Sequence, residues 1–148
     1  MSQEAKAFNA TLLADGLFAA MRWLNSRVPY RYSAVFRFKG ETLHSICLID
    51  KEDITVSACT DQPITNSYCT YIRQTSQSFH VEDSLADGRV NGHPKQHVFQ
   101  SYYGVPLCTE EGHILGTLCH FDDAPIRVTG DVASTLDELA PIVAKVIL

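Results

Sequence analysis

The sequence predicts one α+β domain over residues 1–148, in which helices cover the faces of an antiparallel sheet. Apolar residues recur at the helical period near both ends of the chain. Between the two ends, a strand pattern, a short turn and a second strand pattern follow one another twice, as in β-hairpins. Strands joined by hairpins are antiparallel, so the order helix, hairpin, helix, strand, irregular segment, hairpin, helix indicates the α+β class.

The composition is that of a folded protein without a strongly charged partner. The chain is 45% hydrophobic and 20% charged, with a net charge of −5, and it has no cluster of Lys and Arg. Nucleic acids and membranes are therefore not expected partners. The polar residues 1–6 do not resemble a signal peptide, no apolar run reaches the length of a membrane span, and the five scattered cysteines include no C-x-x-C pair. We expect a cytoplasmic protein with free thiols.

The first element is predicted to be one long helix over residues 4–27. Four polar residues lie within about 20° of one line along it: Glu4, Thr11, Asp15 and Arg22. Most of the remaining circumference is apolar, which is more than the arc of about 100° that contact with one sheet requires. We therefore expect two neighbours for this helix, with another subunit as a candidate for one of them. Deep burial within the domain is the alternative.

The central elements follow from alternation, turn residues and caps. Pro29 ends the first helix. The predicted elements after it are strands 32–38 and 42–49, a loop over 50–62, a helix from 65 to about 75, a strand at 78–81, an irregular segment over 82–100, and strands 101–107 and 114–121.

A final helix is predicted over residues 129–148. Thr129 is suited to cap its first turn, and Asp131 is favourable near its positive end. Apolar residues recur at the helical period, namely Val132, Leu136, Leu139, Val143 and Ile147. Pro141 lacks a backbone N–H, so we expect a kink there or a helix in two pieces.

Short motifs in the middle of the chain resemble the GAF domains of bacterial signalling proteins. The resemblance is close over residues 31–122, and the flanking helices match in arrangement only. The motifs are Ser67-Tyr68-Cys69, Val81-Glu82-Asp83, Leu85-Ala86-Asp87, Asn91-Gly92-His93-Pro94, Tyr103-Gly104-Val105-Pro106-Leu107, Glu111-Gly112-His113 and Ile114-Leu115-Gly116-Thr117-Leu118-Cys119.

The resemblance implies a six-stranded antiparallel sheet with a small-molecule pocket and an irregular loop on one face. The terminal helices are then expected on the other face, where they form a homodimer through a helical bundle. The candidate interface residues are Leu13, Leu17, Leu24, Leu136 and Val143. GAF-like domains bind very different small molecules, so the resemblance implies a sensory or regulatory function in signal transduction without naming a ligand or cofactor.

Three of the seven candidate pocket residues come from the irregular segment, which in GAF-like domains forms a wall of the pocket. They are Phe36, Cys69, Asp83, His93, His97, Tyr102 and Cys119. Solvent exposure of the histidines is the alternative. His93 and His97 are four residues apart, but the intervening Pro94 disfavours a helical metal site, so no metal is predicted.

Cys69 is the cysteine with the strongest link to chemistry, because the first turn of a helix favours the thiolate. Free methionine-R-sulfoxide reductases, which are GAF-fold enzymes, have a cysteine at the start of this helix. They also need a catalytic cysteine just after a Gly-His, whereas residues 92–97 contain no thiol. A structural thiol and a non-enzymatic domain are therefore expected. A reductase with Cys69 as its resolving thiol is the alternative.

Two further expectations concern the pocket face of the sheet. Cys119-His120 is similar to the bilin-attaching pair of phytochrome-like proteins, but neighbouring residues of a strand face opposite sides, so both cannot line one pocket. We expect Cys119 to face the core. A ligandless dimerisation module is the last alternative, in which aromatic side chains fill the pocket: Phe36, Phe79, Phe99 and Tyr102.

Overall fold

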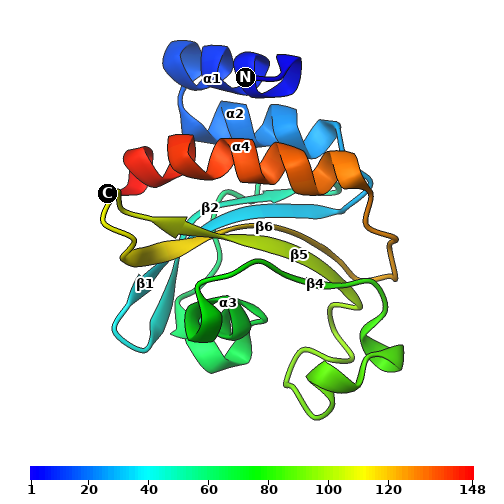
Figure 1. Cartoon of the computed structure of the whole chain (residues 1–148). Helices are drawn as coiled ribbons and strands as arrows, with labels where there is room; N and C mark the ends of the chain where they lie inside the picture. The colour runs from blue at the N-terminus through cyan, green and yellow to red at the C-terminus, as the bar shows by residue number, and fades with distance from the viewer.

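A six-stranded antiparallel sheet forms the centre of the computed structural model, which describes residues 1–148 (Figure 1). Its strands lie in the order β3-β2-β1-β6-β5-β4. The strands are β1 (Tyr32–Lys39), β2 (Thr42–Asp50), β3 (Gln62–Pro63), β4 (Phe79–Val81), β5 (Ser101–Cys108) and β6 (Ile114–Asp122). The α-helices are α1 (Gln3–Asp15), α2 (Leu17–Ser26), α3 (Cys69–Thr75) and α4 (Gly130–Ile147), and short 3-10 turns are η1 (Ile64–Asn66), η2 (Ser84–Ala86) and η3 (Gly88–Val90).

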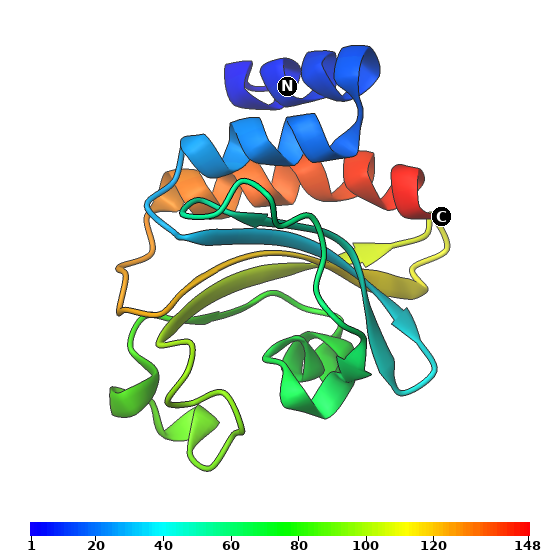
Figure 2. The same cartoon turned by 180° about the vertical axis from the view of Figure 1, so that it is seen from behind.

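Both predicted hairpins are present, as β1–β2 and β5–β6, and β1 pairs with β6 to join them. The helices α2 and α4 cover one face of the sheet, while α3 and the segment 82–100 lie on the opposite face (Figures 1 and 2). The predicted α+β architecture with six antiparallel strands is therefore confirmed.

Both faces of the sheet are buried, and the pleat assigns alternate residues to each. On β6, Leu118 belongs to the hydrophobic core beneath the helices, whereas Cys119 and Phe121 belong to the core on the α3 side. Cys119 therefore faces the core, and His120 points to the opposite side of the sheet from it, as the alternation predicts.

The predicted single helix over residues 4–27 is wrong, because the chain breaks at Gly16 into α1 and α2. Gly16 has φ of +92°, a conformation that residues with a Cβ adopt only at a cost. Its N–H donates to the carbonyl of Leu12 and ends α1. The helix α1 then lies back along the outer side of α2 (Figure 1). The Asp15-Gly16 pair after an apolar periodic segment is a local stop signal that periodicity alone does not contain.

This break supplies the second neighbour that the apolar circumference requires. Ala5 and Phe8 of α1 are fully buried in one core with Met21 and Leu24 of α2, so α2 packs between the sheet and α1 of its own chain.

Three of the five candidate interface residues are wrong, because the domain itself buries them. Leu24, Leu136 and Val143 are buried in the domain's own core and have no free surface to offer. Leu13 is 79% exposed and Leu17 is partly buried, so these two remain candidates.

The C-terminal helix begins as expected and is continuous. The Thr129 side chain accepts a hydrogen bond from the N–H of Val132. α4 runs unbroken through Pro141, so the alternative of a helix in two pieces is wrong. Pro141 lies on the exposed side of α4, where water can satisfy the carbonyl that lacks a donor. No helix of the structure has the length and apolar character needed to span a membrane.

Candidate functional site: an aromatic cavity on the α3 side of the sheet

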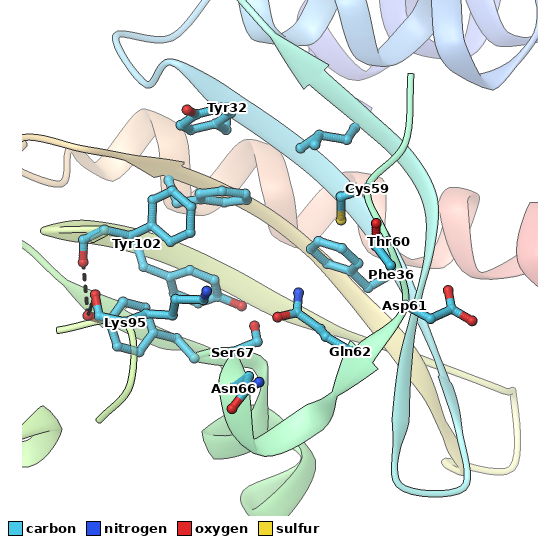
Figure 3. A pocket seen from close by; sticks show the side chains of 14 residues that line it. Tyr32, Phe36, Cys59, Thr60, Asp61, Gln62, Asn66, Ser67, Lys95 and Tyr102 are labelled. Atoms are coloured by element: carbon cyan, nitrogen blue, oxygen red, sulfur yellow. Dashed lines mark hydrogen bonds between the residues drawn. The ribbon is translucent and has the colours of Figure 1, made fainter. Parts of the chain in front are cut away.

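A cavity of about 400 Å³ lies against the sheet on the side opposite the terminal helices. Strands β1, β2, β5 and β6 provide its floor, and the segments 59–62, 66–68 and 95–99 provide its walls and rim (Figure 3). It is lined by Tyr32, Phe36, Leu48, Cys59, Thr60, Asp61, Gln62, Asn66, Ser67, Tyr68, Lys95, Phe99, Tyr102 and Phe121.

Aromatic side chains dominate one end of the cavity and pack on one another. The ring of Tyr32 stacks on Phe121 at 5.0 Å between centroids, and Phe99 meets Phe121 edge to face at 4.7 Å. Tyr68 and Tyr102 make a further edge contact at 5.6 Å. Ring pairs of this geometry stabilise one another beyond the burial of their area, so they form a defined wall.

Hydrogen bonds hold the irregular segment 82–100 over the sheet. The buried Tyr68 hydroxyl donates to the carbonyls of Lys95 at 3.2 Å and Phe99 at 2.9 Å. The Ser84 hydroxyl donates to the carbonyl of Gln96 at 2.6 Å, and the N–H of Ser84 donates to the carbonyl of Gln100. Because its backbone is tied to α3 and to itself, this segment is an ordered wall of the cavity.

Some polar groups of the rim are hydrogen-bonded within the chain, and others are not. The Asp61 carboxylate lies 2.7 Å from Nδ1 of His44 and points away from the cavity centre (Figure 3). The side chains of Thr60, Gln62 and Asn66 have no hydrogen-bond partner within the chain, while Ser67 accepts one from the N–H of Cys69. The rim therefore offers unpaired hydrogen-bonding groups to a bound molecule.

Phe36 and Tyr102 are the two predicted pocket residues that line this cavity. Asp83 instead caps η2 by accepting a hydrogen bond from the N–H of Leu85, so its placement in the pocket is wrong. His97 is exposed outside the cavity, which is the solvated alternative for that residue.

His93 lies behind the cavity wall and not inside it, so its predicted place in the pocket is also wrong. Its ring packs on Tyr68 at 4.7 Å and on Tyr71 at 5.7 Å. Nε2 donates to the carbonyl of Ser67, and Nδ1 accepts from the N–H of Lys95. These two bonds suit a neutral ring, and burial lowers the pKa of His93. His93 thus supports Tyr68 from the outside.

Cys69 and Cys119 are fully buried beside the cavity floor and do not line it, so both are wrong as pocket residues. The Cys69 sulfur lies 3.2 Å from the Tyr102 hydroxyl and 3.2 Å from the Thr117 hydroxyl. Burial acts to raise the pKa of the Cys69 thiol, but hydrogen bonds from its neighbours, Cys119 first among them, bring it below its ordinary value. Burial raises the pKa of Cys119. All five cysteines are free thiols.

A second buried polar network lies on the helix face of the sheet. His120 is fully buried, and its Nδ1 lies 2.6 Å from the hydroxyl of Ser33, which also bonds the Asn25 amide at 2.8 Å. The ring of Tyr30 stacks on His120 at 5.5 Å. Burial, followed by the charge of Lys51, lowers the pKa of His120 to about 3. This network belongs to the core and does not reach the cavity.

Several lining residues were not predicted, and a signal for some of them was available. Tyr32 lies at the same parity as Phe36 along β1, and Phe121 at the same parity as Cys119 along β6, so period-two alternation places them on the cavity face. Cys59 and Lys95 lie in irregular segments with no such pattern. No cluster of three or more potential metal ligands is formed.

Known structures share the fold of this chain over almost its whole length. The GAF domain of an Acinetobacter phosphoenolpyruvate-protein phosphotransferase superposes with a TM-score of 0.77 at 12% identity, covering 99% of this chain and 94% of that one. The chain has the GAF fold. A putative GAF sensor protein from Burkholderia vietnamiensis matches with a TM-score of 0.72 at 17% identity, covering 96% and 89% of the two chains.

The GAF fold is shared by enzymes and by signalling domains among the similar structures. The free methionine-R-sulfoxide reductase of Neisseria meningitidis, solved with its substrate, matches with a TM-score of 0.71 at 19% identity and covers 98% and 90% of the two chains. No protein-family profile matches the sequence. No curated protein matches it either.

Proposed function

We propose that this chain is a sensory or regulatory GAF domain that binds a small molecule in the aromatic cavity. The observation that carries the proposal is the cavity itself, which is about 400 Å³ in volume, walled by aromatic rings and rimmed by unpaired polar groups. Binding sites for small molecules are typically apolar clefts of roughly 300–1,000 Å³ with a few polar groups that orient the ligand. The similar Burkholderia protein is described as a putative GAF sensor.

The cavity favours ligand binding over a ligandless dimerisation module. Phe36, Phe99 and Tyr102, three of the rings expected to fill the pocket in the ligandless alternative, line the cavity and leave it open. The fourth, Phe79, packs against Tyr71 outside it. The rings therefore surround a space that a small molecule can enter and do not fill it.

Signalling through the terminal helices is the second part of the proposal. The sheet is a single layer between the cavity and the helices, so neighbouring residues of one strand contact opposite sides of it. Phe36 lines the cavity, and the adjacent Val35 packs in the core beneath α2 and α4. A ligand that shifts β1 would change the packing of these helices, and a homodimer formed through the exposed helix surfaces would transmit the change, provided its two states bind the ligand with different affinity.

Native mass spectrometry with an absorbance spectrum of the freshly purified protein tests this proposal. A co-purified mass adduct that is retained in Cys59→Ala and absent in Cys59→Phe is expected, because the Cys59 thiol points into the cavity and a ring would occupy it (Figure 3). The same spectra report the dimer mass. A screen of metabolites by thermal shift follows if no adduct is seen. Identical results for the two variants in both measurements would contradict the proposal.

A reductase is the second candidate function, favoured by the likeness to the Neisseria enzyme and by the lowered pKa of Cys69. The Cys69 thiol has no exposed surface, and the floor of the cavity separates it from the cavity. We therefore expect no turnover of free methionine sulfoxide in a thiol-regenerated assay. Turnover that is lost in Cys69→Ala would instead establish the reductase.

A further inference from the structure

We propose that the ligand of the aromatic cavity is a small aromatic carboxylate whose anionic group binds the ammonium of Lys95. This inference rests on the proposed function and names the chemical class of the ligand. It follows from three features of the cavity: an unpaired cation inside it, an acid that is turned away from it, and aromatic walls around the remaining space.

Lys95 brings a positive charge into the cavity without a partner. Its side chain is half-buried and extends across the cavity toward Ser67 and Gln62 (Figure 3). Its ammonium forms neither a salt bridge nor a hydrogen bond within the chain, whereas the ammonium of Lys51 donates to two backbone carbonyls. An ammonium without a partner is best stabilised by an anion, because charge-assisted hydrogen bonds are about twice as strong as neutral ones.

The backbone holds this lysine in position. Its carbonyl accepts hydrogen bonds from the Tyr68 hydroxyl at 3.2 Å and from the N–H groups of Val98 and Phe99 at 2.9 Å each. Its own N–H donates to Nδ1 of His93 at 3.0 Å. The stem of Lys95 therefore starts from a fixed point, and less conformational freedom is lost when its ammonium meets a ligand.

The acidic residue of the rim does not balance this charge. The Asp61 carboxylate is bonded to His44 and points outward (Figure 3). The inward polar groups besides Lys95 are neutral: Gln62, Asn66, Ser67 and Thr60. A cationic ligand would meet a like charge, and the ammonium of a zwitterion would have no acid to pair with inside the cavity. The geometry therefore selects a net anionic ligand.

The aromatic walls of the cavity favour a ligand with an aromatic ring system. Six aromatic rings surround the space, from Tyr32, Phe36, Tyr68, Phe99, Tyr102 and Phe121. A flat aromatic body gains both apolar burial and edge or face contacts with such rings. A volume of about 400 Å³ lies near the lower end for small-molecule sites, which suits a ligand of one or two rings.

Isothermal titration calorimetry with three probes of one shape tests the inference. The probes are indole-3-acetate, its neutral amide indole-3-acetamide, and the cation tryptamine. We expect the acid to bind the wild-type chain at least tenfold more tightly than the amide, and tryptamine to bind most weakly. Lys95→Met should lower the affinity for the acid by tenfold or more and change the affinity for the amide by less than twofold. Lys145→Met, the matched control at an exposed lysine of α4 on the other side of the sheet, should leave the affinities of all three probes unchanged.

The outcomes separate this inference from the proposed function. If the amide binds as well as the acid, or if Lys95→Met weakens both equally, the inference is overturned while the cavity remains a binding site. Binding of tryptamine as tight as that of the acid, or tighter, would overturn it in favour of a cationic ligand. Failure of all three probes also overturns it, and the Cys59→Phe comparison then decides the proposed function independently. Far-UV circular dichroism establishes that each variant is folded.

Discussion

The buried His120 makes the stability of this domain depend on pH. Its pKa is lowered to about 3 in the folded chain, first by burial and then by the charge of Lys51. In the unfolded chain the ring titrates at about 6.5. Below pH 6.5 the ring of His120 binds a proton in the unfolded chain but stays neutral in the folded chain. Proton binding therefore stabilises the unfolded state. The contribution of His120 to stability is complete above pH 6.5 and is lost as the pH falls toward 3.

The magnitude follows from the two pKa values. One pKa unit corresponds to about 1.4 kcal/mol, so the free energy of unfolding falls by about 2 kcal/mol between pH 7 and pH 5 through this residue alone. That is a large part of the roughly 5–15 kcal/mol that stabilises a typical domain. His93, whose pKa is also lowered by burial, acts in the same direction.

Urea unfolding followed by circular dichroism at pH 7, 6 and 5 measures this effect. His120→Gln removes the titrating ring and should flatten the pH dependence, although the variant is less stable at pH 7 because its packing on Tyr30 is lost. His97→Gln is the matched control, since His97 is exposed, and it should keep the full slope. The reasoning is refuted if His120→Gln and the wild type lose the same free energy between pH 7 and pH 5.

Three further substitutions test the fold and the cavity wall by urea unfolding. Gly116→Ala should cost about 3 kcal/mol, because a Cβ there would overlap the carbonyl oxygen of Phe36 across the β1–β6 pair; an unchanged midpoint would contradict the close approach. Gly16→Ala should cost about 1 kcal/mol through its positive φ alone, since no atom lies within 4 Å of the added Cβ; a stabilised variant would indicate that residues 4–27 form one helix. Tyr68→Phe should cost about 1–2 kcal/mol and loosen segment 95–99, seen as faster amide exchange, because the hydroxyl hydrogen shared by the carbonyls of Lys95 and Phe99 is lost. Tyr71→Phe, whose hydroxyl makes no hydrogen bond, is its control, and equal effects of the two would refute the role of Tyr68.

The candidate site was predictable where it rests on strands. Phe36 and Tyr102 were expected in the pocket, and both line it. Alternation along β6 also separated Cys119 from His120 correctly. Side-chain direction in a strand depends on the local pleat, so sequence parity assigns it where the pairing is regular, as between β1 and β6. The bulge in β2 reverses the parity, and Leu43 and Leu48 both face the α3 side.

The irregular segment was less predictable because no local period governs it. Asp83 and His93 were expected in the pocket, yet one caps η2 and the other packs behind Tyr68. Lys95, which enters the cavity, was overlooked. Its position depends on the hydrogen bond to Tyr68, which lies 27 residues away along the chain.

The class of fold, both hairpins, the capped C-terminal helix and the opposite faces of Cys119 and His120 follow from the amino-acid sequence, because these features depend on periods of two or 3.6 residues and on short turns. Tertiary structure alone decided which residues surround the cavity and which interface candidates were already buried, such as Leu24 and Leu136. The physical reason is that both depend on contacts between segments far apart in the chain. Gly16 lies between the two cases: its stop signal is local, but the packing of α1 along α2 is a tertiary contact.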